Sequence, residues 1–378
     1  MLNVKKLAIA LAAIGIAGAA QAQTNVTVYG RLNTSLEQTK VQGEKSVTQM
    51  VNNSSRIGFR GNEDLGNGMS ALFQIESGFR SDSGGGNLAS RDTFVGLKSN
   101  LGTVKLGYIT SPLYYATHDY LGMHNHDTGN SSDPFLWYQA FDPDNFFVRN
   151  SVSYASPTFG GGFTFEAQYS ALNEQATDTA TRNDRPTHYS ATLSYDNGPL
   201  HVGFGYAQTN RFYNFDEGKS KDSMLALAAV YDFKAVVVGA LAERSKSKNG
   251  GLLAGTTAFD DDGARIDGTG VSGDRSRNYY RVAVMVPVGA NEFHVNYGVA
   301  QDWSSTDDTG ARQLTLAYNY NLSKRTKVYA QWTKIDNDKQ KVSIANGGAY
   351  DGGGAYSFLG SDLGLDNTAF GVGLRHNF

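Results

Sequence analysis

The sequence predicts an all-β protein, a sixteen-stranded antiparallel transmembrane β-barrel. Three observations lead to this fold. Apolar residues recur with a period of two, the connections between such segments alternate in length, and charged and apolar side chains fall on opposite faces. The stretch NNSSRIGFRG at 52–61 shows the third feature. In a strand its Ile57 and Phe59 lie on one face, whereas Arg56 and Arg60 lie on the other.

The N-terminus reads as an export signal. Lys5 and Lys6 precede an apolar run and an A-x-A cleavage signal that ends at Ala22. We therefore expect residues 1–22 to be a cleaved signal peptide and residues 23–378 to form one barrel domain. No later stretch approaches about 18 consecutive apolar residues, so the sequence predicts no membrane-spanning helix.

Composition excludes several classes of protein. The chain has no cysteine, which for an exported protein excludes disulfide bridges and thiolate metal sites. Without Lys5 and Lys6, 31 of the 33 basic residues remain against 36 acidic ones, a net charge of −5. This balance does not indicate binding to nucleic acid.

The alternation marks out the strands. In 187–195, Tyr189 and Leu193 share one face, and His188 and Ser190 share the other. The predicted strands cover 24–37, 54–63, 68–78, 91–98, 102–109, 149–155, 162–171, 187–196, 199–209, 221–231, 234–243, 278–287, 292–302, 311–321, 326–336 and 367–378.

The connections alternate between tight turns, such as 64–67 and 196–199, and long polar links, such as 110–148 and 244–277. Short connections at one end and long ones at the other are typical of an up-and-down barrel whose ends face different compartments. Strands of about ten residues, tilted by roughly 40°, cover the ~25 Å apolar band of an outer-membrane barrel.

The apolar face must point outward. A barrel of sixteen strands encloses a lumen too wide for side chains to fill, so an apolar interior would leave a large dry void. Arginine facing lipid at the bilayer midplane costs about 2–4 kcal/mol, whereas Arg56 and Arg60 keep their hydration in a watery lumen. Tyr and Phe, 41 residues together, are concentrated near strand ends, as at two membrane interfaces.

Five stretches carry a family resemblance that covers the whole mature chain. They are VTVYGRLNTSLEQ (26–38), SSRIGFRGNEDLGNGMSALFQIESGF (54–79), RDTFVGLKSNLGTVKLGY (91–108), RNSVSYASPTFGGGFTFEAQYS (149–170) and the end, FGVGLRHNF. Together they resemble the trimeric general-diffusion porins of Gram-negative bacteria, most closely the β-proteobacterial type.

The resemblance implies an outer-membrane channel for passive diffusion of small hydrophilic solutes and ions. It also implies a homotrimer in contact with outer-membrane lipid and lipopolysaccharide, without enzymatic activity or cofactor. The terminal Phe378, preceded by alternating apolar residues, resembles the signal read by the outer-membrane assembly machinery. His376 departs from the aromatic or aliphatic residue usual at its position.

The resemblance also assigns lumen residues. In this family, basic residues on the lumen wall face acids on the inward-folded third extracellular loop. The wall positions at the constriction correspond to Arg31, Arg56, Arg91 and Arg149. Strand alternation places Arg31, Arg56 and Arg149 on polar faces independently, and it adds further lumen residues. These are Arg60, Glu76, Arg80 and Lys105. Arg60 lies nearer the periplasmic turn than Arg56 and should matter less to selectivity.

The link at about 110–148 is the predicted constriction loop, because links of this length are usually functional. Its middle, DPFLWYQAFDPD, differs from the Pro-Glu-Phe-Gly-Gly motif of many enterobacterial members, so individual loop acids cannot be carried over. The candidate acids are Asp119, Asp127, Asp133, Asp142 and Asp144. We expect a weak anion preference from the four wall arginines.

Three other interpretations have less support in the sequence. MHNHD (123–127) has metal-ligand residue types, but its spacing on a loop favours a solvated segment, and we expect no metal. A catalytic triad would need Ser or Asp beside a His and an orienting third group, but His188, His201 and His294 fall on the lumen face of separate strands and no motif surrounds the serines. A substrate-specific channel, with an aromatic track along the lumen, is the main alternative; a barrel enzyme or adhesin is the other.

Overall fold

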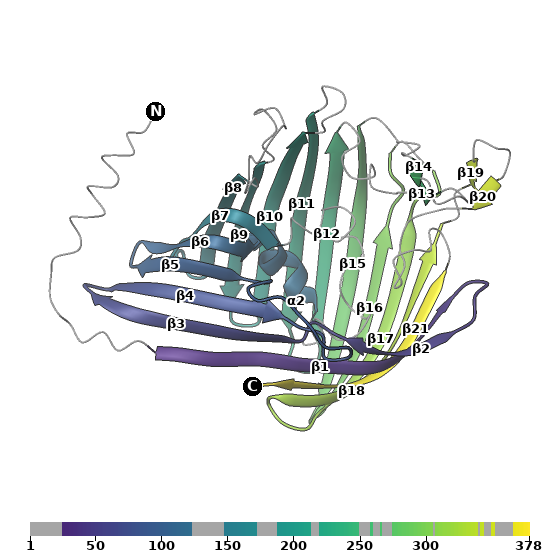
Figure 1. Ribbon diagram of the computed structural model, residues 1–378, viewed down its shortest axis with the longest axis horizontal. Coiled ribbons are helices and arrows are strands. Elements are labelled where there is room, and N and C mark those ends of the chain that lie inside the picture. The colour runs from purple at the N-terminus through teal and green to yellow at the C-terminus, as the bar shows by residue number, and fades with distance from the viewer. Residues whose placement is uncertain are drawn as a thin grey trace.

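The computed structural model describes residues 25–122, 147–171, 187–212, 219–248, 258–259, 265–266, 274–304, 307–338, 341–343, 349–351 and 366–378. Within these residues, one antiparallel sheet runs round a closed barrel (Figure 1). Its first strands are β1 (Asn25–Val41), β2 (Val47–Asn52), β3 (Arg56–Gly66), β4 (Met69–Gly78), β5 (Thr93–Ser99), β6 (Gly102–Thr110), β7 (Phe147–Ala155), β8 (Phe163–Ala171) and β9 (Thr187–Asn197).

The second half of the barrel consists of β10 (Leu200–Phe212), β11 (Lys219–Asp232), β12 (Val237–Lys248), β15 (Arg275–Val288), β16 (Asn291–Ala300), β17 (Ala311–Asn321), β18 (Thr326–Asn337) and β21 (Asn367–Asn377). Two short ladders stand apart from the barrel sheet: β13 (Ala258–Phe259) with β14 (Arg265–Ile266), and β19 (Lys341–Ser343) with β20 (Ala349–Asp351). Two short helical turns, η1 (Tyr114–His118) and α2 (Asp119–Leu121), follow β6.

The barrel has sixteen strand positions, because β2 and β3 share one. β1 pairs with β3 along its first part and with β2 along its second part. The interruption between β2 and β3 falls at residues 53–55, where Ser54 has a φ of 55°. The predicted strand at 54–63 is therefore part of a longer, broken strand. The other predicted strands are confirmed with shifts of a few residues at their ends.

β21 closes the barrel against β1. The two strands pair from Arg31 opposite Asn377 to Val41 opposite Asn367. Beyond this ladder, Gly30 and Phe378 exchange two backbone hydrogen bonds of 3.1 Å. A side chain at Gly30 would overlap the Phe378 ring, so the last residue packs onto a position that only glycine can occupy. Closure of this kind leaves no unpaired sheet edge in the membrane.

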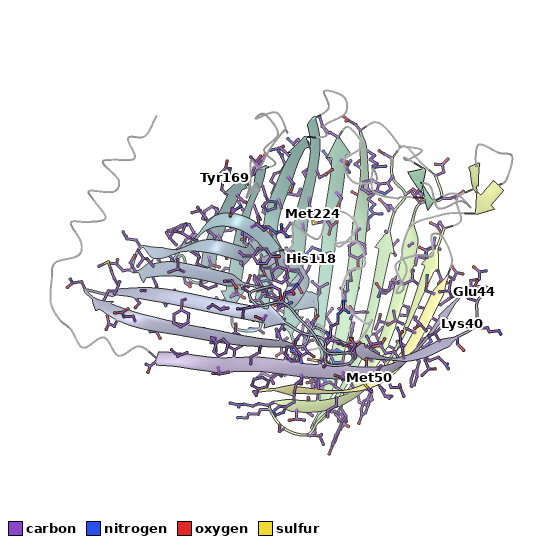
Figure 2. All side chains as sticks on the ribbon, viewed as in Figure 1. Lys40, Glu44, Met50, His118, Tyr169 and Met224 are labelled. Carbon is purple, nitrogen blue, oxygen red and sulfur yellow. The ribbon has the colours of Figure 1, made fainter. Side chains whose placement is uncertain are left out.

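Burial confirms that the apolar face is the outer one. Tyr169 is 54% exposed on the outside, whereas His118 and Met224 lie inside (Figure 2). On β16 the outward residues Phe293, Val295 and Tyr297 are exposed, and the polar residues between them are buried. The buried polar positions on the lumen side include all three strand histidines predicted there: His188, His201 and His294.

The two ends of the barrel differ as predicted. The connections β3–β4, β5–β6, β9–β10 and β15–β16 are tight turns at one end, here called the short-turn end. The links after β6, β12 and β18 lie at the other, long-link end. In outer-membrane barrels the long links are extracellular. No helix in the described residues is long and apolar enough to cross a membrane.

Candidate functional site: a charged lumen with an inward segment

Arg31 and Arg56 occupy directly opposite positions on β1 and β3. Their neighbours Leu32 and Phe59 are exposed on the outer face, so alternation puts both arginines on the lumen side. The Arg31 side chain donates a 3.1 Å hydrogen bond from Nε to the Asn377 side-chain oxygen. Like charges directly opposite one another repel by about 1 kcal/mol at 4 Å in water. The pair therefore concentrates positive potential at one place on the wall.

Glu76 on β4 lies beside this pair and is buried. Its carboxylate accepts a 2.9 Å hydrogen bond from the Tyr29 hydroxyl and forms an ion pair with Arg91. The Arg91 guanidinium also lies 4.9 Å from the centre of the Phe147 ring. The structure thus fixes Arg91 near the lumen wall and partly compensates its charge. Sequence alternation placed Glu76 in the lumen but gave no sign of this pairing.

Gly58 makes the contact between Tyr29 and Glu76 possible. It lies opposite Tyr29 on β3 and opposite Glu76 across the next ladder. A Cβ atom at Gly58 would overlap the Tyr29 ring, so the ring crosses above a position without a side chain. Arg60, on the same face, stacks its guanidinium 4.9 Å from the centre of that ring. Arg60 is nearer the short-turn end than Arg56, as the sequence predicted.

The alternation argument for Arg149 is wrong. The pairing of β6 with β7 shifts register between Gly107 and Ile109, and Asn150 has a φ of 49°. A bulge of this kind inserts an extra residue and interrupts the alternation of faces. The face of Arg149 therefore does not follow from Ser151. Arg149 is exposed at the start of β7, and its assignment rests on the family resemblance alone.

Arg80 is also placed differently from the prediction. It lies beyond the end of β4, exposed in a turn where its backbone bonds to Gly84 and Gly85, so it does not share a strand face with Glu76. Lys105 does lie on the lumen side of β6, with its ammonium 5.1 Å from the centre of the Phe94 ring. It is close enough to Glu166 on β8 for an electrostatic interaction.

The first part of the predicted constriction loop folds into the barrel. Asp92 holds its start, because Oδ1 accepts hydrogen bonds from the backbone and side chain of Thr110, at 2.6 and 2.8 Å. The Tyr115 hydroxyl donates a 3.0 Å bond to the other Asp92 oxygen. Burial beside this carboxylate raises the pKa of Tyr115, so the phenol keeps its proton and remains a donor.

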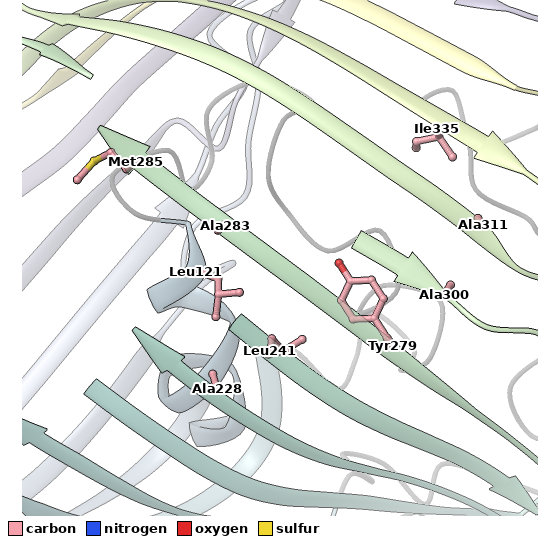
Figure 3. Packing of buried hydrophobic residues seen from close by; sticks show 9 residues of the cluster. All are labelled: Leu121, Ala228, Leu241, Tyr279, Ala283, Met285, Ala300, Ala311 and Ile335. Atoms are coloured by element: carbon pink, nitrogen blue, oxygen red, sulfur yellow. The ribbon is translucent and has the colours of Figure 1, made fainter. Parts of the chain in front are cut away.

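Residues 111–122, here called the inward segment, lie against the lumen face of the wall opposite β1. β10 is eight strand positions away from β1 in a barrel of sixteen positions, so the two strands lie on opposite sides of the lumen. Gly203 and Gly205 on β10 leave room for it, since side chains there would overlap Ala116 and Leu113. Leu121 packs with Ala228, Leu241, Ala283 and Met285 of β11, β12 and β15 (Figure 3). The wall residues that contact the inward segment are thus small or apolar.

Polar contacts fix the inward segment at two further points. His118 Nε2 lies 3.0 Å from Glu243 Oε2 on β12, and both side chains are almost fully buried. His201 on β10 contacts the Ala116 carbonyl oxygen at 3.0 Å through Nε2 and Asp196 at 2.7 Å through Nδ1.

The Tyr120 side chain adds a further contact between the inward segment and Asp196. Its hydroxyl donates a 3.2 Å hydrogen bond to Asp196. Burial and the nearby Asp196 carboxylate raise the pKa of Tyr120 to about 12, so the phenol stays a hydrogen-bond donor at neutral pH.

Of the predicted loop acids, the structure places only Asp119, the first residue of α2, partly exposed on the inward segment. The positions 127, 133, 142 and 144 lie outside the described residues. In the described part of the chain no group of three or more His, Cys, Asp or Glu residues could hold a metal ion.

Sequence reasoning missed a second group of basic lumen residues. Arg275, Arg277 and Arg281 lie on the inner face of β15 and are buried. Their spacing of two and four residues was visible in the sequence. Strand alternation does not place the first two, because they fall in the stretch 244–277 that is predicted to be a link.

A closed β-barrel with an apolar outer face, a charged lumen and a chain segment folded into it defines an outer-membrane channel protein. A family model described as Gram-negative porin matches residues 8–340, and the chain belongs to this family. Outer membrane porin protein 32 of Delftia acidovorans is 29% identical over 390 residues, covering 99% of this chain and 100% of the relative.

A second relative is an outer membrane porin protein of Bordetella pertussis, 30% identical over 410 residues and covering 98% of this chain and 99% of the relative. Among solved structures, an anion-selective porin from Comamonas acidovorans aligns with a TM-score of 0.72 at 27% identity. The alignment covers 94% of this chain and 100% of that one. The protein is therefore an outer-membrane porin, a channel for passive diffusion.

Proposed function

We propose that this porin prefers anions and that Arg31, Arg56 and Arg91 form the basic wall of its constriction. The observation that carries the proposal is the register of β1 and β3, which sets Arg31 directly beside Arg56 with the inward segment on the opposite wall. Basic groups on a narrow wall raise the local concentration of anions. A relative of known structure is described as anion-selective, which supports the same preference.

Carboxylates of the constriction loop face this wall in the proposal, with Asp119 as the described candidate and 127, 133, 142 and 144 as the others. Acids opposite arginines set up a transverse field that orients a polar solute as it crosses. Arg149 joins the wall on the family resemblance only. Glu76 weakens the contribution of Arg91 to the preference, because its carboxylate is ion-paired with the Arg91 guanidinium.

The test is the reversal potential of single channels in planar bilayers under a KCl gradient. Arg56→Ala should lower the chloride-to-potassium permeability ratio by about two- to threefold, since one unit charge near the ion path contributes under about 1 kcal/mol in water. Arg60→Ala is the matched control: it lies on the same strand and face, but nearer the short-turn end. Equal effects of the two substitutions, or cation preference in the unmodified channel, would refute the proposal.

We also propose that the porin is a homotrimer, that it contacts lipopolysaccharide and that it has no enzymatic activity. The family resemblance supports a homotrimer. The exposed outward residues Arg244, Lys246 and Lys248, at the long-link end of β12, suit the phosphates of lipopolysaccharide. The absence of catalysis is supported by two lumen histidines, because His118 and His188 are held in buried contacts with Glu243 and Thr209.

A further inference from the structure

Two histidines attach the inward segment to the barrel wall, and each of them faces hydrogen-bond acceptors on both sides of its ring. His118 lies on the segment and reaches β12, whereas His201 lies on β10 and reaches the segment. Both side chains are buried. A neutral imidazole has one donor nitrogen and one acceptor nitrogen, so it cannot donate to two acceptors at once. The number of protons on each ring therefore decides whether these contacts are attractive.

At His118 the neighbouring groups fix where both protons lie. The Thr117 hydroxyl donates its proton to the Leu113 carbonyl oxygen at 2.6 Å, so it accepts from His118 Nδ1 at 2.9 Å. On the other side of the ring, Nε2 lies 3.0 Å from Glu243 Oε2. The Ser245 hydroxyl donates a 2.8 Å hydrogen bond to the other Glu243 oxygen. Since an ionised carboxylate only accepts, the contact between His118 and Glu243 holds a second proton, shared by Nε2 and Oε2.

His201 faces two acceptors as well. Its Nε2 lies 3.0 Å from the Ala116 carbonyl oxygen, which cannot donate, and its Nδ1 lies 2.7 Å from Asp196 Oδ1. The same Asp196 oxygen accepts the Tyr120 hydroxyl. The Tyr120 ring stacks parallel to the imidazole, with 3.2 Å between the ring centres, and an aromatic face attracts a cation. All of these contacts suit an imidazolium ring.

The histidines are the groups whose charge changes near neutral pH. Among the described residues, the other charged and titratable groups near the two contacts are Tyr114, Asp119, Tyr120, Tyr279 and Arg281. Arginine is always charged in proteins. Burial and Asp196 raise the pKa of Tyr120 to about 12, so its phenol remains a donor. Histidine is the side chain that ordinarily changes its charge between about pH 5 and 8.

Loss of the shared proton places a lone pair against an oxygen acceptor at each contact. The attraction is therefore present while the proton is bound and is lost as the pH rises. The start of the segment is held differently, because Asp92 accepts hydrogen bonds from Thr110 and Tyr115. Neither of these contacts involves a histidine. Deprotonation thus weakens the later part of the segment and leaves its start in place.

We propose that His118 and His201 form a proton-dependent attachment of the inward segment. The segment lies against the wall while both rings are doubly protonated, and it detaches and widens the channel as the pH rises. The two histidines act as positioning residues, since they hold the segment and do not touch the solute. This regulation deepens the proposed function and rests on the part of it in which the segment narrows the channel.

The first measurement is single-channel recording in planar bilayers at fixed KCl, at about pH 6 and about pH 9, on either side of the ordinary titration of histidine. Losing one charge-assisted hydrogen bond shifts the equilibrium between attached and detached segment by at least about tenfold. A level of higher conductance should therefore be occupied at least about tenfold more often at the higher pH.

Two substitutions made together, His118→Gln and His201→Gln, should remove this response, because a side-chain amide donates equally at both pH values. His188→Gln is the matched control. His188 is a buried lumen histidine on the neighbouring strand β9, and its Nδ1 lies 2.9 Å from the Thr209 hydroxyl, away from the segment. This variant should keep the full response to pH.

The second measurement detects the protons themselves, by NMR of the folded porin with 15N-labelled histidine side chains. His118 and His201, assigned from the two single variants, should each show two protonated ring nitrogens at about pH 6 and one at about pH 9. A neutral ring at the lower pH, a conductance level that does not respond to pH, or a response that persists in the double variant overturns the proposal. Failure of the basic wall is seen separately, as an unchanged reversal potential in Arg56→Ala at a single pH.

Discussion

At the scale of single residues, the potential of the lumen wall depends on its arginines and also on the carboxylates that neutralise them. Arg91 is assigned to the same wall as Arg31 and Arg56, and it is ion-paired with Glu76, which also accepts the Tyr29 hydroxyl hydrogen bond. Glu76 therefore reduces the positive potential that the wall presents to a passing ion. Selectivity depends on which arginines have a carboxylate partner, and not on their number alone.

This compensation predicts the effect of Glu76→Gln. The amide can still accept the Tyr29 hydrogen bond, but the negative charge beside Arg91 is lost. The chloride-to-potassium permeability ratio, measured from reversal potentials, should rise about twofold, since one charge near the path contributes under about 1 kcal/mol in water. Glu44→Gln, at the exposed turn between β1 and β2 (Figure 2), is the control and should leave the ratio unchanged. A fall in the ratio for Glu76→Gln would contradict the role given to this carboxylate.

At the scale of elements, the inward segment and the strands that it packs against are complementary in shape. The lumen faces of β10 and β11 carry Gly203, Gly205, Ala226 and Ala228 where the segment lies. Small residues at these positions bring the helical turns close to the wall. The segment thus lies along one wall of the lumen, where we propose that it narrows the channel.

Gly203→Ala should loosen this arrangement. The added Cβ would overlap the Ala116 carbonyl oxygen, and overpacking of this kind costs about 1–3 kcal/mol. The barrel ladders are much more extensive than the attachments of the segment, so the segment should move and the single-channel conductance should increase. Ala242→Val on the outer face of β12 adds more volume without touching the segment, and its conductance should stay unchanged. An unaltered conductance in Gly203→Ala would show that the segment does not limit ion flow.

The sequence was sufficient to predict the elements but not their irregularities. Alternation located the barrel strands because outward residues such as Phe293 and Val295 meet lipid and inward ones such as His294 meet the lumen. It failed for Arg149, where one extra residue in β7 shifts the register, and local sequence carries no reliable sign of such a bulge. The Glu76–Arg91 pair joins residues fifteen apart through the fold, which periodicity cannot detect.

At the scale of the whole molecule, the barrel depends on a single closing seam. The ladder between β1 and β21 joins the first and last strands of the barrel, and its last pair is Gly30 with Phe378. A barrel that fails to close exposes a row of unpaired backbone groups to lipid, which is strongly unfavourable. The terminal phenylalanine therefore has two separable roles: a backbone role in closure, and the predicted role of its ring as an assembly signal.

Two variants separate these roles. Deleting Phe378 removes both backbone bonds to Gly30, and each unpaired group costs about 1–3 kcal/mol, so refolding into detergent should yield less closed barrel. Phe378→Ala keeps the backbone bonds, so it should refold in detergent nearly as well as the unmodified chain but reach the outer membrane poorly in cells. Both yields can be read from the folded fraction on gels run without heating. If the deletion refolds like the unmodified chain, the seam does not need its last pair. If Phe378→Ala assembles normally in cells, the ring is not the signal.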